Sequence, residues 1–174
     1  MMTGCVSVFL DHIIVALLAP DTADYCQYLD LASGRVLVLG AKEKKQTGLS
    51  ECCEEGWSLL EQEPERFIPL SPLAPQQVTP WYGEFAQACC QGVQRQELLQ
   101  LLEGSGFLAR FYDALACDDL LRESWRQFET EKVRAYFLTL VPAELAVQVC
   151  NFTEQREGAL NAFGYANKRN KTGS

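Results

Sequence analysis

The stretch Gly104-Ser105-Gly106-Phe107 joins two helical patterns and indicates how the C-terminal half of the chain is built. Its first glycine follows a leucine-rich helix predicted over 97–103, and glycine beyond a helix end takes a positive φ without steric cost. The serine or the second glycine can then start a new helix, whose apolar face carries Phe107, Phe111 and Leu115. The pattern predicts a tight helical corner.

Helical patterns continue on both sides of this corner. Predicted helices cover residues 80–92, 97–103, 107–116, 118–141 and, after a proline, 143–152. Thr79, followed by a proline, is expected to cap the first of these helices, and Asp118 the long one. Trp125 and Phe128 fall on the core stripe of the long helix.

The N-terminal half combines strands with helices. Apolar residues at helical spacing and the length of the run predict a helix over 6–18, although its β-branched content also allows a strand. Two β-rich runs around Gly34 predict a hairpin over 25–39. A short helix is expected after Ser50. A third strand is expected over 66–70, at a sheet edge because Pro69 has no N–H to donate.

These elements predict one α+β domain over residues 1–153. We expect a small antiparallel sheet of about three strands, packed against about five to seven helices, with a helical C-terminal half. Residues 154–174 are polar and carry no core pattern, so we expect a disordered tail there.

Composition excludes several functional classes. The chain has 174 residues, 48% of them hydrophobic, and a formal net charge of −8. Such a charge disfavours nucleic acid as a partner. The longest apolar run, from Val6 to Pro20, is too short and too polar to span a bilayer, so we expect a cytoplasmic protein without membrane contact.

The eight cysteines form no C-x-x-C motif, and the single histidine, His12, cannot complete a zinc cluster with them. They occupy positions Cys5, Cys26, Cys52, Cys53, Cys89, Cys90, Cys117 and Cys150. We expect reduced thiols that fill the core, and neither a metal site nor a cofactor.

No catalytic constellation is evident. His12 and Asp11 are neighbours in a predicted helix and would not face each other. Asp118, Asp119 and Asp113 are the best set of paired carboxylates, but an acid at a helix start is expected to cap free N–H groups. We therefore predict no catalytic residue.

One alternative is a small-anion site for a phosphate or carboxylate ligand, with binding or hydrolytic activity. Its candidate ligand-binding residues are Arg66, Gly104, Ser105, Gly106 and Arg110. Backbone amides at a helix start favour anions. No P-loop or dinucleotide-binding motif accompanies them.

Four motifs, in order, resemble a UPF-series family of uncharacterised small acidic bacterial proteins. They are Tyr28-Leu29-Asp30-x-x-x-Gly34-x-Val36, Arg66-Phe67-Ile68, Gly104-x-Gly106-x-x-x-Arg110-Phe111-x-x-x-Leu115 and Trp125-x-x-Phe128. The chain departs from the family pattern at Tyr112, where members usually carry a second basic residue, and at Phe107-Leu108, where they often carry Ala-Phe. The resemblance spans about residues 6–141 and implies an α+β fold, but no activity.

The absence of catalytic chemistry and the abundance of aromatic residues favour a non-enzymatic, cytosolic protein-interaction or regulatory protein. Its partner is then expected to be another protein. The oligomeric state cannot be read from the sequence.

Overall fold

A computed structural model describes residues 6–20, 24–40, 51–143, 145 and 147–150, except for the side chains of 51–54 and 150. In these residues, the chain forms six α-helices, one short 3-10 helix and two sheets. The elements are β1 (Val6–Phe9), α1 (Leu10–Leu18), β2 (Tyr25–Asp30), β3 (Arg35–Gly40), α2 (Glu51–Gln62), η2 (Pro64–Arg66), β4 (Phe67–Pro69), α3 (Pro75–Cys89), α4 (Gly92–Leu101), α5 (Phe107–Cys117), α6 (Asp119–Leu140) and β5 (Val147–Cys150).

The predicted α+β architecture is confirmed. The hairpin strands β2 and β3 pair antiparallel, and β4 adds antiparallel to the other side of β2, giving the order β3-β2-β4. Pro69 lies in the edge strand β4, as its missing N–H requires.

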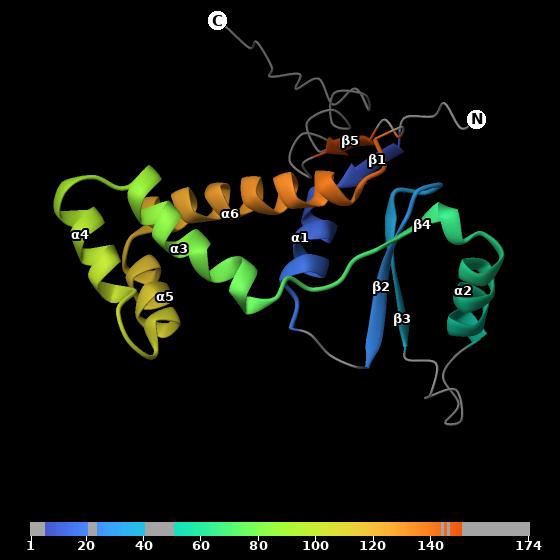
Figure 1. The fold of residues 1–174 in the computed structure, drawn as a ribbon, viewed down its shortest axis with the longest axis horizontal. Coiled ribbons are helices and arrows are strands. Elements are labelled where there is room, and N and C mark those ends of the chain that lie inside the picture. Colours follow the sequence, from blue (N-terminus) through green and yellow to red (C-terminus); the bar gives the residue numbers. More distant parts are fainter. Residues whose placement is uncertain (1–5, 21–23, 41–50, 144, 146, 151–174) are drawn as a thin grey trace, which may run out of the picture.

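The two faces of this sheet pack against different helices. The Gln27 side chain donates to the Ala16 carbonyl of α1 at 3.4 Å, while Trp57 of α2 donates to the Gly40 carbonyl at 3.0 Å. Figure 1 shows α1 on one side of β2 and β3, and α2 on the other. The sheet is therefore covered on both faces.

The predicted helix over 6–18 is correct only from Leu10 onward. Residues 6–9 form β1 instead, which pairs in parallel with β5, from Val6 opposite Val147 to Phe9 opposite Cys150. The helix predicted over 143–152 is wrong at β5 for the same reason. Short β-branched apolar runs fit either structure, and here a distant partner strand decides.

The helical half is built around aromatic side chains. Tyr82 stacks on Trp125 with a centroid distance of 5.0 Å, and Phe111 meets the same tryptophan edge-on at 5.0 Å. Phe85 and Phe111 are fully buried, and Trp125 is only 4% exposed. The aromatic residues thus form the core in which α3, α5 and α6 meet.

Helix α3 starts earlier than predicted. It begins at Pro75 after Ala74, so Thr79 is not its cap and Pro80 lies inside it. The Gln77 side chain accepts from the Ala74 N–H at 2.9 Å, and the Thr79 hydroxyl donates to the Pro75 carbonyl at 2.7 Å. Proline at the first helical position is favourable, and this earlier proline takes that place.

The predicted boundary between a domain over 1–153 and a tail over 154–174 falls outside the described residues, as does the Ser50 cap. Asp118 caps α6 as predicted, because its Oδ1 accepts from the N–H groups of Leu120 and Leu121, both at 3.0 Å.

Candidate functional site

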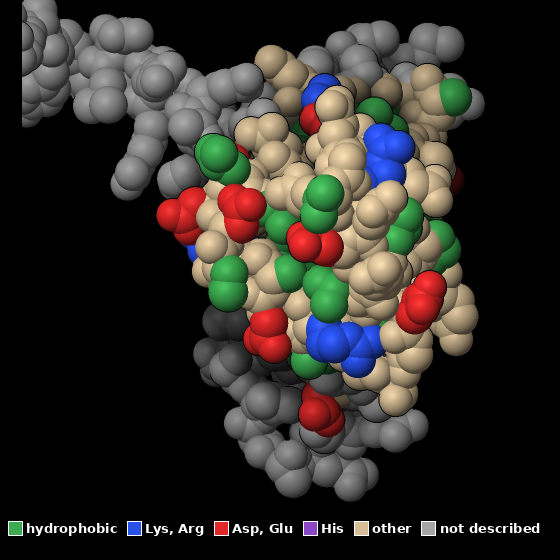
Figure 2. Space-filling view, turned by 90° about the vertical axis from the view of Figure 1, so that its left-hand side faces the viewer, with side chains coloured by type: hydrophobic (Ala, Val, Ile, Leu, Met, Phe, Trp, Pro, Cys, Tyr) green, Lys and Arg blue, Asp and Glu red, His purple; other side chains and the backbone are tan. Residues whose placement is uncertain are grey.

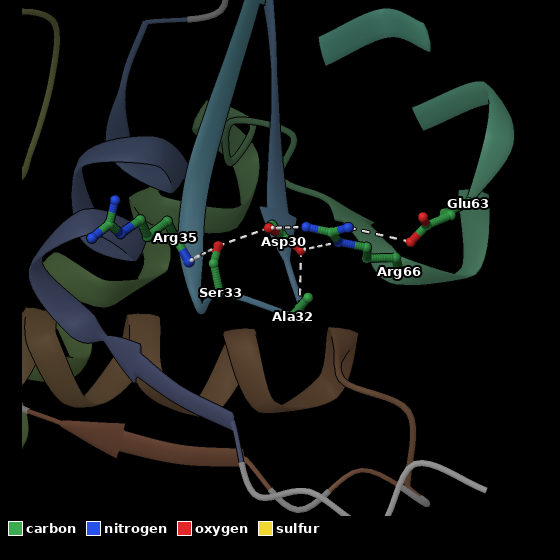
Figure 3. Close-up of polar contacts among 6 residues, drawn as sticks. All are labelled: Asp30, Ala32, Ser33, Arg35, Glu63 and Arg66. Carbon is green, nitrogen blue, oxygen red and sulfur yellow. Dashed lines mark hydrogen bonds and ion pairs between the residues drawn. The ribbon is translucent and has the colours of Figure 1, made fainter. Parts of the chain in front are cut away.

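A partly buried ion pair between Asp30 and Arg66 is the strongest polar feature of the sheet. The guanidinium donates through Nε to Oδ1 at 2.6 Å and through Nη2 to Oδ2 at 2.9 Å. Asp30 also accepts from the Ala32 N–H at 2.9 Å and the Ser33 hydroxyl at 2.7 Å (Figure 3). Glu63 accepts from the remaining Nη1 at 3.2 Å. Both oxygens of the aspartate are therefore occupied.

The ion pair fastens the β2–β3 turn to the neighbouring strand. Asp30 ends β2, and its carbonyl accepts from the Gly34 N–H at 2.7 Å, while Leu31 donates its N–H to the Arg66 carbonyl at 2.8 Å. Gly34 has φ +69°, and a Cβ at this position would collide with the backbone carbonyl oxygen of Ser7. Only glycine fits both the turn and this close approach to β1.

Electrostatics keep this pair charged at neutral pH. The hydrogen bond from Arg66 is the largest cause that lowers the pKa of Asp30, from 3.8 to about 2, against the opposing effect of burial. The hydrogen bond to Asp30 in turn raises the pKa of Arg66. A carboxylate with such a low pKa and no free oxygen is a poor general acid or base. The site is organised to hold structure.

Arg110, the other arginine of the predicted anion site, is also engaged. Its guanidinium donates to the carbonyls of Leu101 at 2.9 Å, Glu103 at 2.6 Å and Ser105 at 2.8 Å. Carbonyls at the C-terminal end of a helix have no partner within the helix. A cation near this end also interacts favourably with the negative end of the helix dipole. Arg110 thus caps α4 from the first turn of α5.

The glycines of this corner behave as predicted. Gly104 has φ +80° and lies two residues beyond Leu102, the C-cap of α4. Gly106 has φ +74° and is the N-cap of α5. The side-chain nitrogen Nη1 of Arg110 lies near Gly106, 3.9 Å from where a Cβ would be. The amides at this helix start are therefore next to a guanidinium that already has partners.

The structure does not bring the five candidate anion ligands together. Arg66 follows from η2 beside β4, whereas Gly104, Ser105, Gly106 and Arg110 lie between α4 and α5. Figure 1 shows these two regions at opposite ends of the long axis of the molecule.

The prediction that the cysteines fill the core is wrong for most of the side chains described. Cys26, Cys89 and Cys117 are exposed, and only Cys90 is buried. Burial is the largest cause that raises the pKa of the Cys90 thiol. All four are free thiols. Within the described residues, no group of three or more His, Cys, Asp or Glu side chains could hold a metal ion.

A second polar region lies in the helical half. Burial, and then a hydrogen bond with Tyr112, raise the pKa of Tyr82. Burial also raises the pKa of the half-buried Glu129, whose charge acts on Tyr82. Of these three side chains, only Tyr112 is largely exposed, at 49%. The group adjoins the aromatic core through Tyr82 and offers no opposed acid and base.

The backbone of β3 has an open side that side-chain patterns did not reveal. Successive residues of a strand direct their N–H and C=O groups alternately to the two sides. The Gln27 carbonyl and the Leu31 N–H bond to residues that flank β4, so the backbone groups of these two residues face β4. By the alternation, the N–H and C=O of Tyr28 face the other side, toward β3. Tyr28 is opposite Leu37, whose groups therefore face β2. The residues on either side of Leu37 face outward.

These outward groups belong to Val36 and Val38. In the described part of the chain, β3 has no strand on that side, and no other backbone group bonds to these two valines. Farther along the edge, the Gly40 carbonyl is taken by Trp57. The Val38 side chain is 54% exposed, so the helix packed on this face of the sheet does not cover it.

The opposite end of the molecule carries isolated apolar side chains. Figure 2 shows the end formed by α4 and α5, where hydrophobic side chains lie separately among acidic ones. Val93 and Leu120 are the most exposed there, at 69% and 82%. Single exposed apolar residues are ordinary on protein surfaces and do not form a docking patch.

Comparison with family models matches residues 7–151 to the Uncharacterised protein family (UPF0158). The chain belongs to this family. No curated protein and no solved structure gives a significant match.

In this UPF0158 chain, the residues that carried the resemblance lie at positions of structural consequence. Asp30 and Arg66 form the ion pair, Arg110 caps α4, and Trp125 is in the aromatic core. None of the helices in the described residues combines the length and the apolar character needed to cross a membrane.

Proposed function

We propose that this chain is a non-enzymatic protein-interaction protein of the bacterial cytoplasm, and that it binds an extended segment of a protein along the outer edge of β3. The observation that supports this is the pair of outward-facing valines, Val36 and Val38, whose backbone groups have no partner among the described residues. An extended segment can add to such an edge through main-chain hydrogen bonds, and pockets for alternate side chains then provide specificity.

Within the part of the chain that the structure describes, the edge at Val36 and Val38 lacks the devices that normally prevent such pairing. Proteins protect edge strands with lysine, proline, bulges or a covering helix. Strand β3, with the sequence Arg-Val-Leu-Val-Leu-Gly, contains no proline and no lysine, and its six-residue register with β2 is uninterrupted. By contrast, the other edge strand, β4, has three residues and ends in Pro69. An unprotected edge beside a protected one supports a binding role for β3.

The small-anion alternative receives no comparable support. Arg66 is held by Asp30 and Glu63, and Arg110 by backbone carbonyls, so neither guanidinium is free to coordinate a ligand without breaking these bonds. A binding surface made of aromatic side chains is likewise not favoured, because the aromatic residues of the helical half are mostly core residues, with Tyr112 the exposed exception.

Capture of proteins from native cytosol tests the proposal, with two matched variants. Val38→Lys places a charge on the open edge, whereas Val93→Lys makes the same change at a valine of α4 that is also well exposed, at 69% against 54%. We expect wild type and Val93→Lys to capture the same proteins in the same amounts. Val38→Lys should capture at least about nine-tenths less of them, which corresponds to a loss of over 1 kcal/mol in binding free energy. Equal capture by all three would refute the role of the edge.

A further inference from the structure

We propose that the extended segment bound by this edge is β3 of a second copy of the chain. The two strands would run antiparallel, related by a two-fold axis beside Leu37. This inference rests on the proposed function of the β3 edge and names its partner. Closed two-fold dimers are the most common form of homo-oligomer, and their interfaces must be self-complementary.

The free backbone groups of β3 meet that requirement. The outward N–H and C=O groups belong to Val36 and Val38, one residue on either side of Leu37. A two-fold axis at Leu37 sets Val36 opposite Val38 of the second copy, and Val38 opposite Val36 of that copy. Each of these pairs exchanges two hydrogen bonds, as the antiparallel ladder does at every second residue. All four free groups on each strand are then satisfied.

The side chains agree with this register. The exposed side chain of Val38, at 54%, gains a β-branched neighbour from the second copy on the same face of the sheet. Arg35, the only charged residue of β3, is set opposite Leu39 of the second copy and not opposite another arginine. The two copies, each with a net charge of −8, repel each other over most of their surface, but β3 brings no acidic side chain to this contact.

Mass in solution gives the first test. We expect wild type to have twice the 19.5 kDa mass of one chain at micromolar concentration, by light scattering or sedimentation. Val38→Pro removes only an outward N–H, so it keeps the ladder to β2 but should weaken the dimer at least about tenfold. Val93→Pro, in the first turn of α4 where proline is tolerated, should leave the mass unchanged.

A cysteine placed on the axis gives the second test, which does not depend on a proline in the sheet. Leu37 would lie opposite Leu37 of the second copy in a non-hydrogen-bonded pair, where Cα atoms are about 4.5 Å apart, within disulfide range. We expect Leu37→Cys to form an intermolecular disulfide at position 37 under mild oxidation, as peptide mapping would show. Val38→Cys, opposite Val36 of the second copy, should form several-fold less.

Three outcomes count against the inference. A monomeric wild type, a dimer that Val38→Pro leaves intact, or preferential linking through Val38→Cys would overturn the stated pairing. If the wild type is monomeric but still loses captured proteins in the Val38→Lys variant, the edge binds a different protein: the proposed function stands, and self-pairing fails. If the protein dimerises through β3 but captures no other protein, the inference of a β3 dimer stands, and binding of a different protein at this edge is not supported.

Discussion

Replacing Asp30 by asparagine tests whether the ion pair stabilises the sheet. The change keeps the size of the side chain but removes the charge that holds Arg66, and it turns an acceptor into an NH₂ donor within the cluster. A carboxyl whose pKa falls from 3.8 to about 2 on folding contributes about 2 kcal/mol of stability at neutral pH. We expect Asp30→Asn to lower the free energy of unfolding at pH 7 by about 2–3 kcal/mol, measured by urea melts.

The pH dependence gives this prediction its sign. The pKa of Asp30 is lower in the folded state than in the unfolded state, so its stabilisation is complete above the unfolded pKa, near pH 4, and is lost as the pH falls toward 2. At pH 3, roughly half of that contribution should be gone. The difference between wild type and Asp30→Asn should therefore narrow from pH 6 to pH 3, because the variant has no group to protonate at this position.

Glu63→Gln is the matched control. Glu63 also accepts from Arg66, but its side chain is 53% exposed, and exposed ion pairs contribute at most about 1 kcal/mol. We expect only a small loss for this variant. An Asp30→Asn variant as stable as wild type at pH 7, or a difference that stays constant down to pH 3, would refute the assignment of the stability to the ionised pair.

Three further predictions concern the turn and the helical half. Gly34→Ala should destabilise far more than Gly92→Ala in thermal melts: both glycines have positive φ, at 69° and 54°, but a Cβ at Gly34 meets the β1 backbone, whereas at Gly92 it meets nothing within 4 Å. Equal effects would show that the β1 contact gives way easily. Trp125→Ala removes a buried core side chain and should lower the free energy of unfolding by about 3–5 kcal/mol in urea melts. Arg110→Ala should cost at least as much as Gly104→Ala, on the order of 1–2 kcal/mol, because it leaves α4 carbonyls without a partner; a neutral Arg110→Ala in urea melts would contradict the capping role.

Local signals in the sequence predicted much of the fold correctly. The positive φ at Gly104, the capping by Asp118 and the edge position of Pro69 each follow from the chemistry of one residue and its immediate neighbours. Such constraints act within a few residues and are visible in a single sequence. This is why the hairpin, the helical corner and the long helix were found.

Features that depend on distant residues were predicted less well. Val6 and Val8 fit a helix or a strand equally, and the choice depends on β5, whose sequence also fits both. The start of α3 was misplaced because two prolines could each occupy the first helical position, and the structure uses the earlier one. The exposure of the cysteines was also mispredicted, because packing and not residue type decides whether a side chain is buried.

The candidate site shows a related limit. From the sequence, Arg66 and Arg110 were candidate anion ligands, but in the structure other groups already bind both guanidinium groups. The partner of Arg66, Asp30, lies 36 residues away in the chain, and the partners of Arg110 are backbone carbonyls, which have no sequence signature. The open edge at Val36 and Val38 was not predicted, since the direction of their backbone groups depends on the strand register.

The pairing of β1 with β5 constrains the order in which the chain can fold during synthesis. Val6 meets Val147, about 140 residues later, so β1 leaves the ribosome long before its partner strand exists. At about 5–20 residues per second, the interval is roughly 7–30 seconds. Strand β1 must therefore wait as an apolar segment while the hairpin, held by local contacts, can form at once. Pairing of β1 with β5 can begin only after the hairpin and the helices between them in the chain have been synthesised.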